Sequence, residues 1–152
     1  PGERVPQAVA LSDPLAEAVD WSVTYLNAPA AWKATKGKGV TVAVLDTGVD
    51  SEHCDLKDAL DESRDFTNSR SGAADVQGHG THCAGSIAAR ENGRGLVGVA
   101  PECRLLNAKV LGDSGSGSVD GIARGIDWAN ARGADVISMS LGGPSRDSWI
   151  PP

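Results

Sequence analysis

Apolar runs alternate with amphipathic segments over most of the chain, and this alternation limits the folds that the sequence can form. Val40–Leu45 is a continuous β-branched and apolar run, typical of a strand buried on both faces of a parallel sheet. Arg104–Leu111 and Ala134–Leu141 predict two further strands. Helices are predicted between the strands, over His79–Glu91 and Ser118–Arg132. The order strand, helix, strand, helix, strand predicts an α/β fold with a parallel β-sheet flanked by helices.

The segments outside this pattern are less regular. We interpret residues 1–27 as an N-terminal arm, in which Asp13-Pro14 could begin a short helix through Val19. The polar segment 50–76 is predicted to be a loop, with a short strand around Asp65-Phe66. Residues 28–152 carry the α/β pattern and form the second predicted unit.

Composition excludes several classes of partner. The formal net charge is −6 at pH 7, whereas nucleic acids and anionic membranes bind basic surfaces. No apolar run reaches the length of about 18 residues that a membrane-spanning helix needs. The three cysteines, Cys54, Cys83 and Cys103, leave at least one thiol unpaired within the chain. The chain begins at Pro1 without an initiator Met or a signal-peptide apolar region, and we expect it to be a processed or trimmed product.

Candidate functional residues gather where the predicted strands end. In open α/β sheets, ligands bind beyond the carboxyl ends of the strands. Asp46 follows the first predicted strand, a glycine-rich loop over 112–117 follows the second, and Ser140–Gly143 ends the third. The helix that starts at His79 begins on the same side. A histidine that takes a proton from a nucleophile and an aspartate that orients the histidine are two of the three parts of a catalytic triad.

Five sequence motifs resemble those of the subtilisin-like serine proteases, in the same order along the chain. They are VAVLDTGVD (42–50), GHGTHCAG (78–85), GVAP (98–101), VLGDSGSG (110–117) and SMSLGG (138–143). Each motif alone is a weak or moderate signal, but five in register are a strong one. The resemblance implies a subtilisin-like fold that is incomplete at its C-terminal end. It also implies a serine endopeptidase that hydrolyses peptide bonds with an Asp-His-Ser triad, in which Asp46 orients the imidazole and His79 is the general base.

The same resemblance implies a binding site for an extended polypeptide substrate. Two edges of the protein would pair with the substrate backbone, as in the addition of a strand to a sheet. These edges are Gly115, Ser116 and Gly117 on one side, and Ser140, Leu141 and Gly142 on the other. The glycine-rich loop could alternatively bind a phosphate, but it lacks the lysine of a P-loop, and Asp113 would repel an anion.

A structural Ca²⁺ site is a further implication of the resemblance. Its expected ligands are side-chain oxygens or backbone carbonyls of six residues: Glu17, Asp55, Arg90, Asn92, Arg94 and Leu96. Oxygen ligands in this number suit Ca²⁺. The sequence departs from the family at Cys54, where a proline is usual, and in the two arginines of the ligand loop.

Other interpretations of the histidine motif remain open at this point. His79 and His82 could be metal ligands, although no third ligand follows at a suitable spacing. Asp46-Thr47-Gly48 matches the aspartic-protease signature, but that chemistry needs two such carboxylates in an all-β fold. The resemblance implies that His82 makes structural hydrogen bonds. It implies that Cys83 is a buried free thiol near the catalytic groups, which makes such enzymes sensitive to mercurials.

The sequence lacks the family's nucleophile. The serine lies in a G-T-S-M-A string well downstream in the family, the oxyanion-hole asparagine lies between, and neither has a counterpart before Pro152. We therefore expect the chain alone to be inactive. It could be the N-terminal part of an endopeptidase, whose family is usually secreted and whose partners include a pro-segment and the missing C-terminal part. The alternative is a non-catalytic remnant of the same fold that binds peptides or a partner protein.

Overall fold

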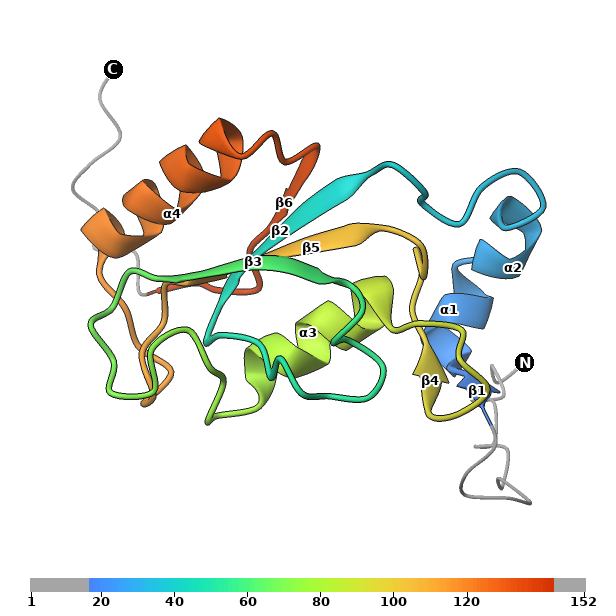
Figure 1. The fold of residues 1–152 in the computed structure, drawn as a ribbon, viewed down its shortest axis with the longest axis horizontal. Helices are drawn as coiled ribbons and strands as arrows, with labels where there is room; N and C mark the ends of the chain where they lie inside the picture. The colour runs from blue at the N-terminus through green and yellow to red at the C-terminus, as the bar shows by residue number, and fades with distance from the viewer. Residues whose placement is uncertain (1–16, 144–152) are drawn as a thin grey trace, which may run out of the picture.

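The structure is a computed structural model that describes residues 17–143 (Figure 1). Within this range the chain forms ten elements in the following order: β1 (Ala18–Val19), α1 (Trp21–Tyr25), α2 (Ala28–Ala31), β2 (Thr41–Asp46), β3 (Leu60–Asp65), α3 (His79–Ala88), β4 (Leu96–Val97), β5 (Arg104–Lys109), α4 (Val119–Ala131) and β6 (Val136–Ser138). No helix within the described range is long and apolar enough to cross a membrane.

The main sheet has four strands in the order β3-β5-β2-β6, and every neighbouring pair is parallel. β2 pairs with β5 along its whole length, from Thr41 opposite Arg104 to Asp46 opposite Lys109. All six residues of β2 are buried. The predicted α/β fold with a parallel sheet is therefore confirmed, and its most apolar run forms an inner strand.

Successive residues of β2 face opposite sides of the sheet, so two apolar clusters form. Val42 and Val44 pack with Ala84 and Ala88 of α3 in one cluster. Ala43 and Leu45 pack in the other, which contains Trp128 and Ala129 of α4. Figure 1 shows α3 and α4 on opposite sides of the sheet. The sheet thus buries both faces, as the apolar run of β2 requires.

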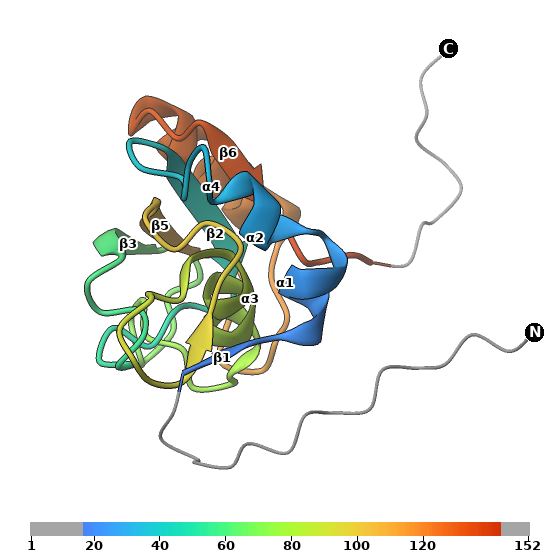
Figure 2. The same cartoon turned by 90° about the vertical axis from the view of Figure 1, so that its right-hand side faces the viewer.

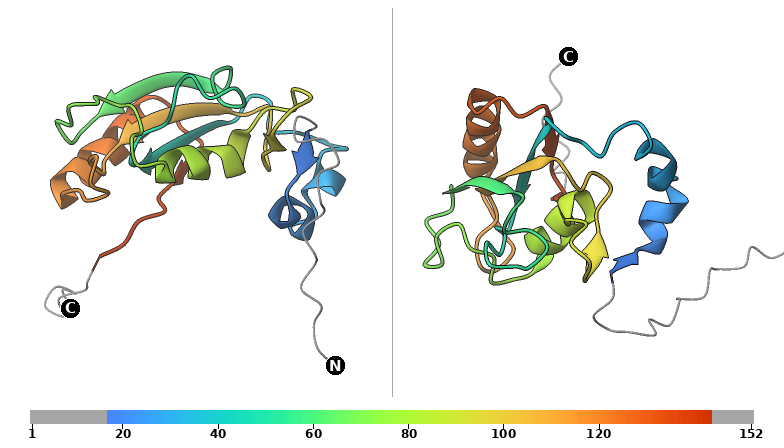
Figure 3. Two further views of the ribbon diagram at one scale, coloured as in Figure 1. Left: turned by 90° about the horizontal axis from the view of Figure 1, so that it is seen from below. Right: turned by 45° about the vertical axis from the view of Figure 1, so that its right-hand side comes forward.

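The N-terminal segment differs from the prediction of a helix through Val19. The part of that helix before residue 17 lies outside the described residues, but Ala18 and Val19 form strand β1, which pairs in parallel with β4 (Figure 2). The helix begins later, at Trp21, because the Asp20 carboxylate accepts the Ser22 N–H at 2.8 Å and caps the first turn. Figure 3 shows α1 and α2 at the opposite end of the molecule from α4.

The other differences between predicted and observed elements lie at the two edge strands of the sheet and at the end of α3. β3 spans Leu60–Asp65, longer than the short strand expected near Phe66, and its polar sequence fits an edge strand that pairs only with β5. β6 is shorter than expected, because Val136–Ser138 pairs only with β2 at the other edge of the described sheet. α3 ends at Ala88 rather than at Glu91. Patterns of apolar residues are weakest where a strand has one neighbour.

Candidate active site

The last residue of β2 and the first residue of α3 meet at the carboxyl end of the sheet. Oδ1 of Asp46 lies 2.6 Å from Nδ1 of His79. Asp46 is 1% exposed, whereas the His79 side chain is 44% exposed. This contact uses Nδ1 of the imidazole, so Nε2 makes no bond to Asp46. The side chain that carries Nε2 is accessible to solvent. The hydrogen bond to Asp46, and then the negative charge of Asp46, raise the pKa of His79, because both stabilise the imidazolium.

The Asp46 carboxylate is held by its own backbone as well. Oδ1 also accepts the Thr47 N–H at 2.7 Å, so one oxygen receives two donors. Oδ2 is buried and has no hydrogen-bond partner among the described residues. The carboxylate is therefore fixed in place through Oδ1, while the second oxygen retains unused acceptor capacity.

Asp75 connects the loop after β2 to the start of α3. Its Oδ1 accepts hydrogen bonds from Thr47 Oγ1 at 2.9 Å and from the Gly78 N–H at 2.9 Å. Its Oδ2 accepts the Thr81 N–H at 2.9 Å and the Thr81 hydroxyl at 2.7 Å. Thr47 Oγ1 in turn accepts the Gly80 N–H at 2.9 Å. These bonds satisfy free N–H groups at the helix start and hold the residues next to the Asp46–His79 pair.

The hydrogen bonds of Asp75 lower the pKa of its carboxyl. Partial burial alone would raise the pKa of the Asp75 carboxyl, but hydrogen bonds from Thr81, Gly78 and Thr47 outweigh burial and lower this pKa to about 2. None of the five sequence motifs contains Asp75. The signal that could have identified it is its position three residues before the glycine that precedes α3, from which a carboxylate reaches the free N–H groups.

We expect Asp75→Asn to lower the free energy of unfolding at pH 7 by about 1–2 kcal/mol, a value reduced for the partial exposure of Asp75. Because the pKa of this carboxyl is depressed in the folded state, its contribution is present above the unfolded value of 3.8 and is lost as the pH falls toward about 2. The difference between variant and parent should therefore shrink from pH 4 to pH 2, as measured by urea unfolding. Asp127→Asn, on an exposed face of α4, is the control. A difference that stays constant down to pH 2 contradicts the assignment.

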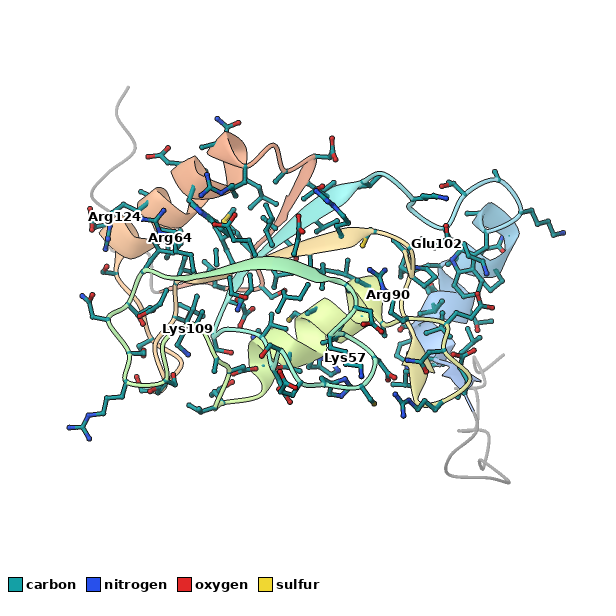
Figure 4. All side chains as sticks on the ribbon, in the orientation of Figure 1. Lys57, Arg64, Arg90, Glu102, Lys109 and Arg124 are labelled. Atoms are coloured by element: carbon teal, nitrogen blue, oxygen red, sulfur yellow. The ribbon has the colours of Figure 1, made fainter. Side chains whose placement is uncertain are left out.

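Lys109, on β5, also stabilises the loops beside the Asp46–His79 pair. Like Asp75, it lies outside the five sequence motifs. Its side chain is fully buried, and Nζ donates to the carbonyls of Thr47 and Ala74 and pairs with Asp113 at 3.1 Å. Figure 4 shows Lys109 close to the loop that precedes α3. A buried ammonium is stable only when its donors are paired. Lys109 thus connects β5 to the loop that follows β2 and to the loop that precedes α3.

The residues expected to bind a substrate backbone lie on the same side of the sheet. Gly115 has a φ of +80°, which favours glycine, and the loop closes through the Gly112 N–H, which donates to the Ser116 carbonyl at 2.8 Å. Ser116 and Gly117 are exposed, as are Ser140 and Gly142, and Leu141 is half-buried. Their role in binding a substrate stays a prediction.

Cys83 lies one helical turn after His79 and close to its ring. Its Sγ is 3.9 Å from Nδ1 and 4.0 Å from Nε2 of His79. Burial raises the pKa of the Cys83 thiol, although a hydrogen bond with Ser140 opposes the shift. The thiol is therefore protonated at neutral pH, which does not favour a role as nucleophile. Cys54, Cys83 and Cys103 are all free.

His82 lies on α3, three residues after His79. It is exposed and lines a cleft of about 620 Å³ between α1 and α3. Its ring makes no hydrogen bond to another described residue, so the structural bonds expected of it stay a prediction.

Four of the expected calcium ligands come together at the end of α3. Asp55 is 4% exposed, and its Oδ1 lies 3.1 Å from the side-chain amide of Asn92. Oδ2 accepts the Leu96 N–H at 3.4 Å. Oε1 of Glu17 accepts the N–H groups of Asn92 at 2.6 Å and Gly93 at 2.9 Å. Two carboxylates and an amide side chain therefore surround one short loop.

The side chain of Arg90 binds backbone carbonyls rather than the carboxylates of this loop. The guanidinium of Arg90 donates to the carbonyls of Pro101, Cys103 and Asp58. Arg94 contacts Asn92 through its backbone N–H at 3.2 Å. A Cβ on Gly95 would lie 2.2 Å from Asp55 Oδ2, so the loop keeps open the space beside the carboxylate. The carboxylates of Asp55 and Glu17 are oxygen ligands of the kind that Ca²⁺ takes, and binding of the ion stays a prediction.

Comparison with known proteins gives consistent results. Residues 37–150 match the family model described as "Subtilase family" (peptidase S8). The chain is 47% identical over 144 residues to an intracellular serine protease of Paenibacillus polymyxa, covering 92% of this chain and 44% of the relative. It is 48% identical over 129 residues to the major intracellular serine protease of Bacillus subtilis (strain 168), covering 81% and 40%. It is 47% identical over 136 residues to Subtilisin Savinase of Lederbergia lenta, covering 89% and 49%. The chain spans less than half the length of these relatives.

Proposed function

The chain belongs to the subtilase family, and on that premise we propose that it is the N-terminal part of a subtilisin-type serine endopeptidase. The observation that carries the proposal is the 2.6 Å contact between Asp46 and His79, which leaves Nε2 free on an exposed side chain. A buried carboxylate that orients an accessible imidazole is the general-base half of a catalytic triad. The nucleophilic serine and the oxyanion-hole asparagine would come from sequence after Pro152.

In the proposed mechanism, Nε2 of His79 takes the proton of the serine hydroxyl as the oxygen attacks the carbonyl carbon of the substrate. The imidazolium that forms is stabilised by Asp46, which is consistent with the raised pKa of His79. His79 then returns the proton to the leaving amine, and an activated water releases the acyl group in the same way. Gly115–Gly117 and Ser140–Gly142 would hold the polypeptide substrate in an extended conformation between them.

Expression of the complete reading frame tests this function. We expect the full-length product to hydrolyse peptide substrates and a serine-directed phosphonate to block it, whereas the 152-residue chain has no turnover. Turnover by the short chain, blocked by the same phosphonate, contradicts the assigned roles. A natural stop codon after Pro152 instead supports the alternative, a non-catalytic remnant that binds peptides or a partner.

The proposal includes partners and a compartment. The edge strand β6 carries a half-exposed Val136, and Met139 follows it, so a C-terminal part of the protein would cover this edge. A pro-segment is a second expected partner. Secretion is proposed from the resemblance alone, and two of the relatives named above are called intracellular. A leader sequence in the gene upstream of Pro1 decides between the two compartments.

We further propose that Ca²⁺ binds at the loop after α3, through Asp55, Glu17, the Asn92 side chain, and the carbonyls of Arg90, Arg94 and Leu96. When bound, the ion would neutralise the buried Asp55 carboxylate, which among the described residues accepts hydrogen bonds from the neutral donors Cys54, Asn92 and Leu96. Its role would be structural, because it would join the N-terminal arm to the end of α3.

Ca²⁺ at about 100 times its dissociation constant is expected to raise the free energy of unfolding by about 2.7 kcal/mol, because the ion binds only the folded chain. Asp55→Asn should remove this increment, since it removes the charge at the centre of the ligand set. Thermal or urea unfolding with added CaCl₂ or EGTA measures it. Asp58→Asn, at an exposed position in the same segment, is the control and should retain the increment. If both variants respond to Ca²⁺ equally, the ion binds elsewhere.

A further inference from the structure

Three different metal-binding groups converge where β2 ends and α3 begins. One ligand atom each from Asp46, His79 and Cys83 lie within 4.8 Å of one another. We propose that these side chains form a Zn²⁺-binding site that overlaps the candidate active site. A carboxylate oxygen, an imidazole nitrogen and a thiolate are all ligands that Zn²⁺ accepts.

The separation of sulfur and nitrogen is close to that of a bound ion, and a turn of the His79 ring would direct a nitrogen lone pair at the ion. With Zn–S near 2.3 Å and Zn–N near 2.1 Å in a tetrahedral site, the sulfur and the nitrogen should be about 3.6 Å apart. Sγ of Cys83 lies 3.9 Å and 4.0 Å from the two ring nitrogens of His79. The helical spacing of four residues fixes this approach, because positions i and i+4 share one face of a helix. The His79 side chain is 44% exposed and has room to turn its ring toward the ion.

An unused buried oxygen independently points to a ligand at this position. Asp46 is 1% exposed, and its Oδ2 has no hydrogen-bond partner among residues 17–143. A buried carboxylate oxygen without a partner costs free energy, which a cation would offset. No lysine or arginine forms an ion pair with Asp46 in the described part of the chain, so no fixed positive charge competes with an incoming ion.

The charges and protons of the site balance on binding. Zn²⁺ takes the carboxylate of Asp46, one nitrogen of neutral His79 and the thiolate of Cys83, so the site goes from −1, with Cys83 as a thiol, to neutral as one proton leaves. The S–H bond of Cys83 breaks, the Zn–S bond forms, and one proton is released to solvent. If the ion binds Nδ1, it replaces the proton that Nδ1 shares with Asp46, and the imidazole carries its N–H on Nε2. Three protein ligands leave the fourth position for water.

Zn²⁺ at this site would inhibit the peptidase reversibly. The ion would occupy the histidine that acts as general base and would hold its ring away from the serine. This consequence depends on the proposed function, whereas metal binding itself does not. The two can therefore be tested separately.

A second group on the chain provides an internal comparison. His53, Cys54 and Asp55 also bring three ligand atoms together. There, however, Nδ1 of His53 already accepts the Asp55 N–H at 3.3 Å, and the Cys54 thiol donates to Asp55 at 3.4 Å. Cys54 is exposed, and Asp55 belongs to the candidate calcium site. Cys54→Ser is therefore the matched control for Cys83→Ser.

Binding is tested by titrating the full-length gene product with Co²⁺ as a spectroscopic probe for Zn²⁺, at saturating Ca²⁺. We expect a sulfur-to-cobalt charge-transfer band that Zn²⁺ removes, that Cys54→Ser retains and that Cys83→Ser loses. A band that survives Cys83→Ser but not Cys54→Ser overturns the proposal, as does the absence of any band.

Inhibition is tested on the same protein. Zn²⁺ should inhibit peptide hydrolysis, a zinc-selective chelator should restore it, and Cys83→Ser should raise the inhibitory Zn²⁺ concentration at least about tenfold, since even a lost second-shell contact costs that much. Equal sensitivity of Cys83→Ser and the parent overturns the inhibitory role of this site. A cobalt band at Cys83 in a protein without peptidase activity leaves the metal site standing and overturns the proposed function instead.

Discussion

Asp46→Asn is expected to reduce the kcat of the full-length gene product by about 10⁴-fold, the effect found when the carboxylate of other serine-protease triads is replaced by an amide. Oδ1 of Asp46 accepts from both His79 Nδ1 and the Thr47 N–H. In the variant, the NH₂ group can take the position of Oδ1, where it faces Nδ1 and no longer accepts the Thr47 N–H. The imidazole then carries its proton on Nε2 and cannot accept the proton of the serine.

Steady-state kinetics on a peptide substrate measure this effect, and KM should change little because Asp46 does not contact the substrate. The pKa of His79, followed by NMR, should fall in the variant, because the two largest causes of its increase both come from Asp46. Asp50→Asn is the control, since Asp50 is exposed in the loop that follows β2. A loss in kcat of less than about tenfold would exclude Asp46 from the role assigned to it.

The parts of the fold that sequence predicted correctly are those in which local pattern and tertiary environment agree. β2 lies between two strands and two helices, so all of its residues are buried and its sequence is correspondingly apolar. α4 was predicted within one residue at each end, because Ser118 caps its start by accepting the Gly121 N–H and Gly133 follows its end. The edge strand β3 is polar, and β1 and β4 have two residues each, so neither gave a pattern to detect.

The residues of the candidate site also fall into two groups: those that a sequence motif identifies and those that only the fold brings together. Asp46 and His79 were identified because each lies in a motif at the end of an element, and the structure places them in contact. Asp75 and Lys109 were missed, because both also bond to Thr47, 28 and 62 positions away in sequence, and only the fold brings them together. Asp55 and Asn92, 37 residues apart, were paired through the family resemblance, since no local signal connects them.

Gly80→Ala is expected to destabilise the chain by about 3 kcal/mol or more and to separate His79 from Asp46. A Cβ at residue 80 would lie 2.1 Å from the carbonyl oxygen of Gly48 and 3.1 Å from the Cβ of Asp46. The carbonyl belongs to the backbone of the loop after β2, so no side chain can move to relieve the overlap. Helix α3 would have to shift away from that loop, and His79 is the residue that precedes Gly80. Urea unfolding measures the loss of stability, and NMR measures the pKa of His79, which should fall toward its ordinary value.

Gly85→Ala separates this steric effect from helix propensity. Gly85 is on the same helix, and a Cβ there meets no atom within 4 Å. Alanine favours helix over glycine by up to about 1 kcal/mol, so this variant should be slightly more stable than the parent. If both variants are as stable as the parent and keep the raised pKa of His79, the close approach of α3 to the Gly48 carbonyl is not what positions the catalytic pair. If Gly80→Ala lowers the free energy of unfolding and the pKa of His79 while Gly85→Ala lowers neither, the absence of a Cβ at residue 80 is what lets His79 reach Asp46.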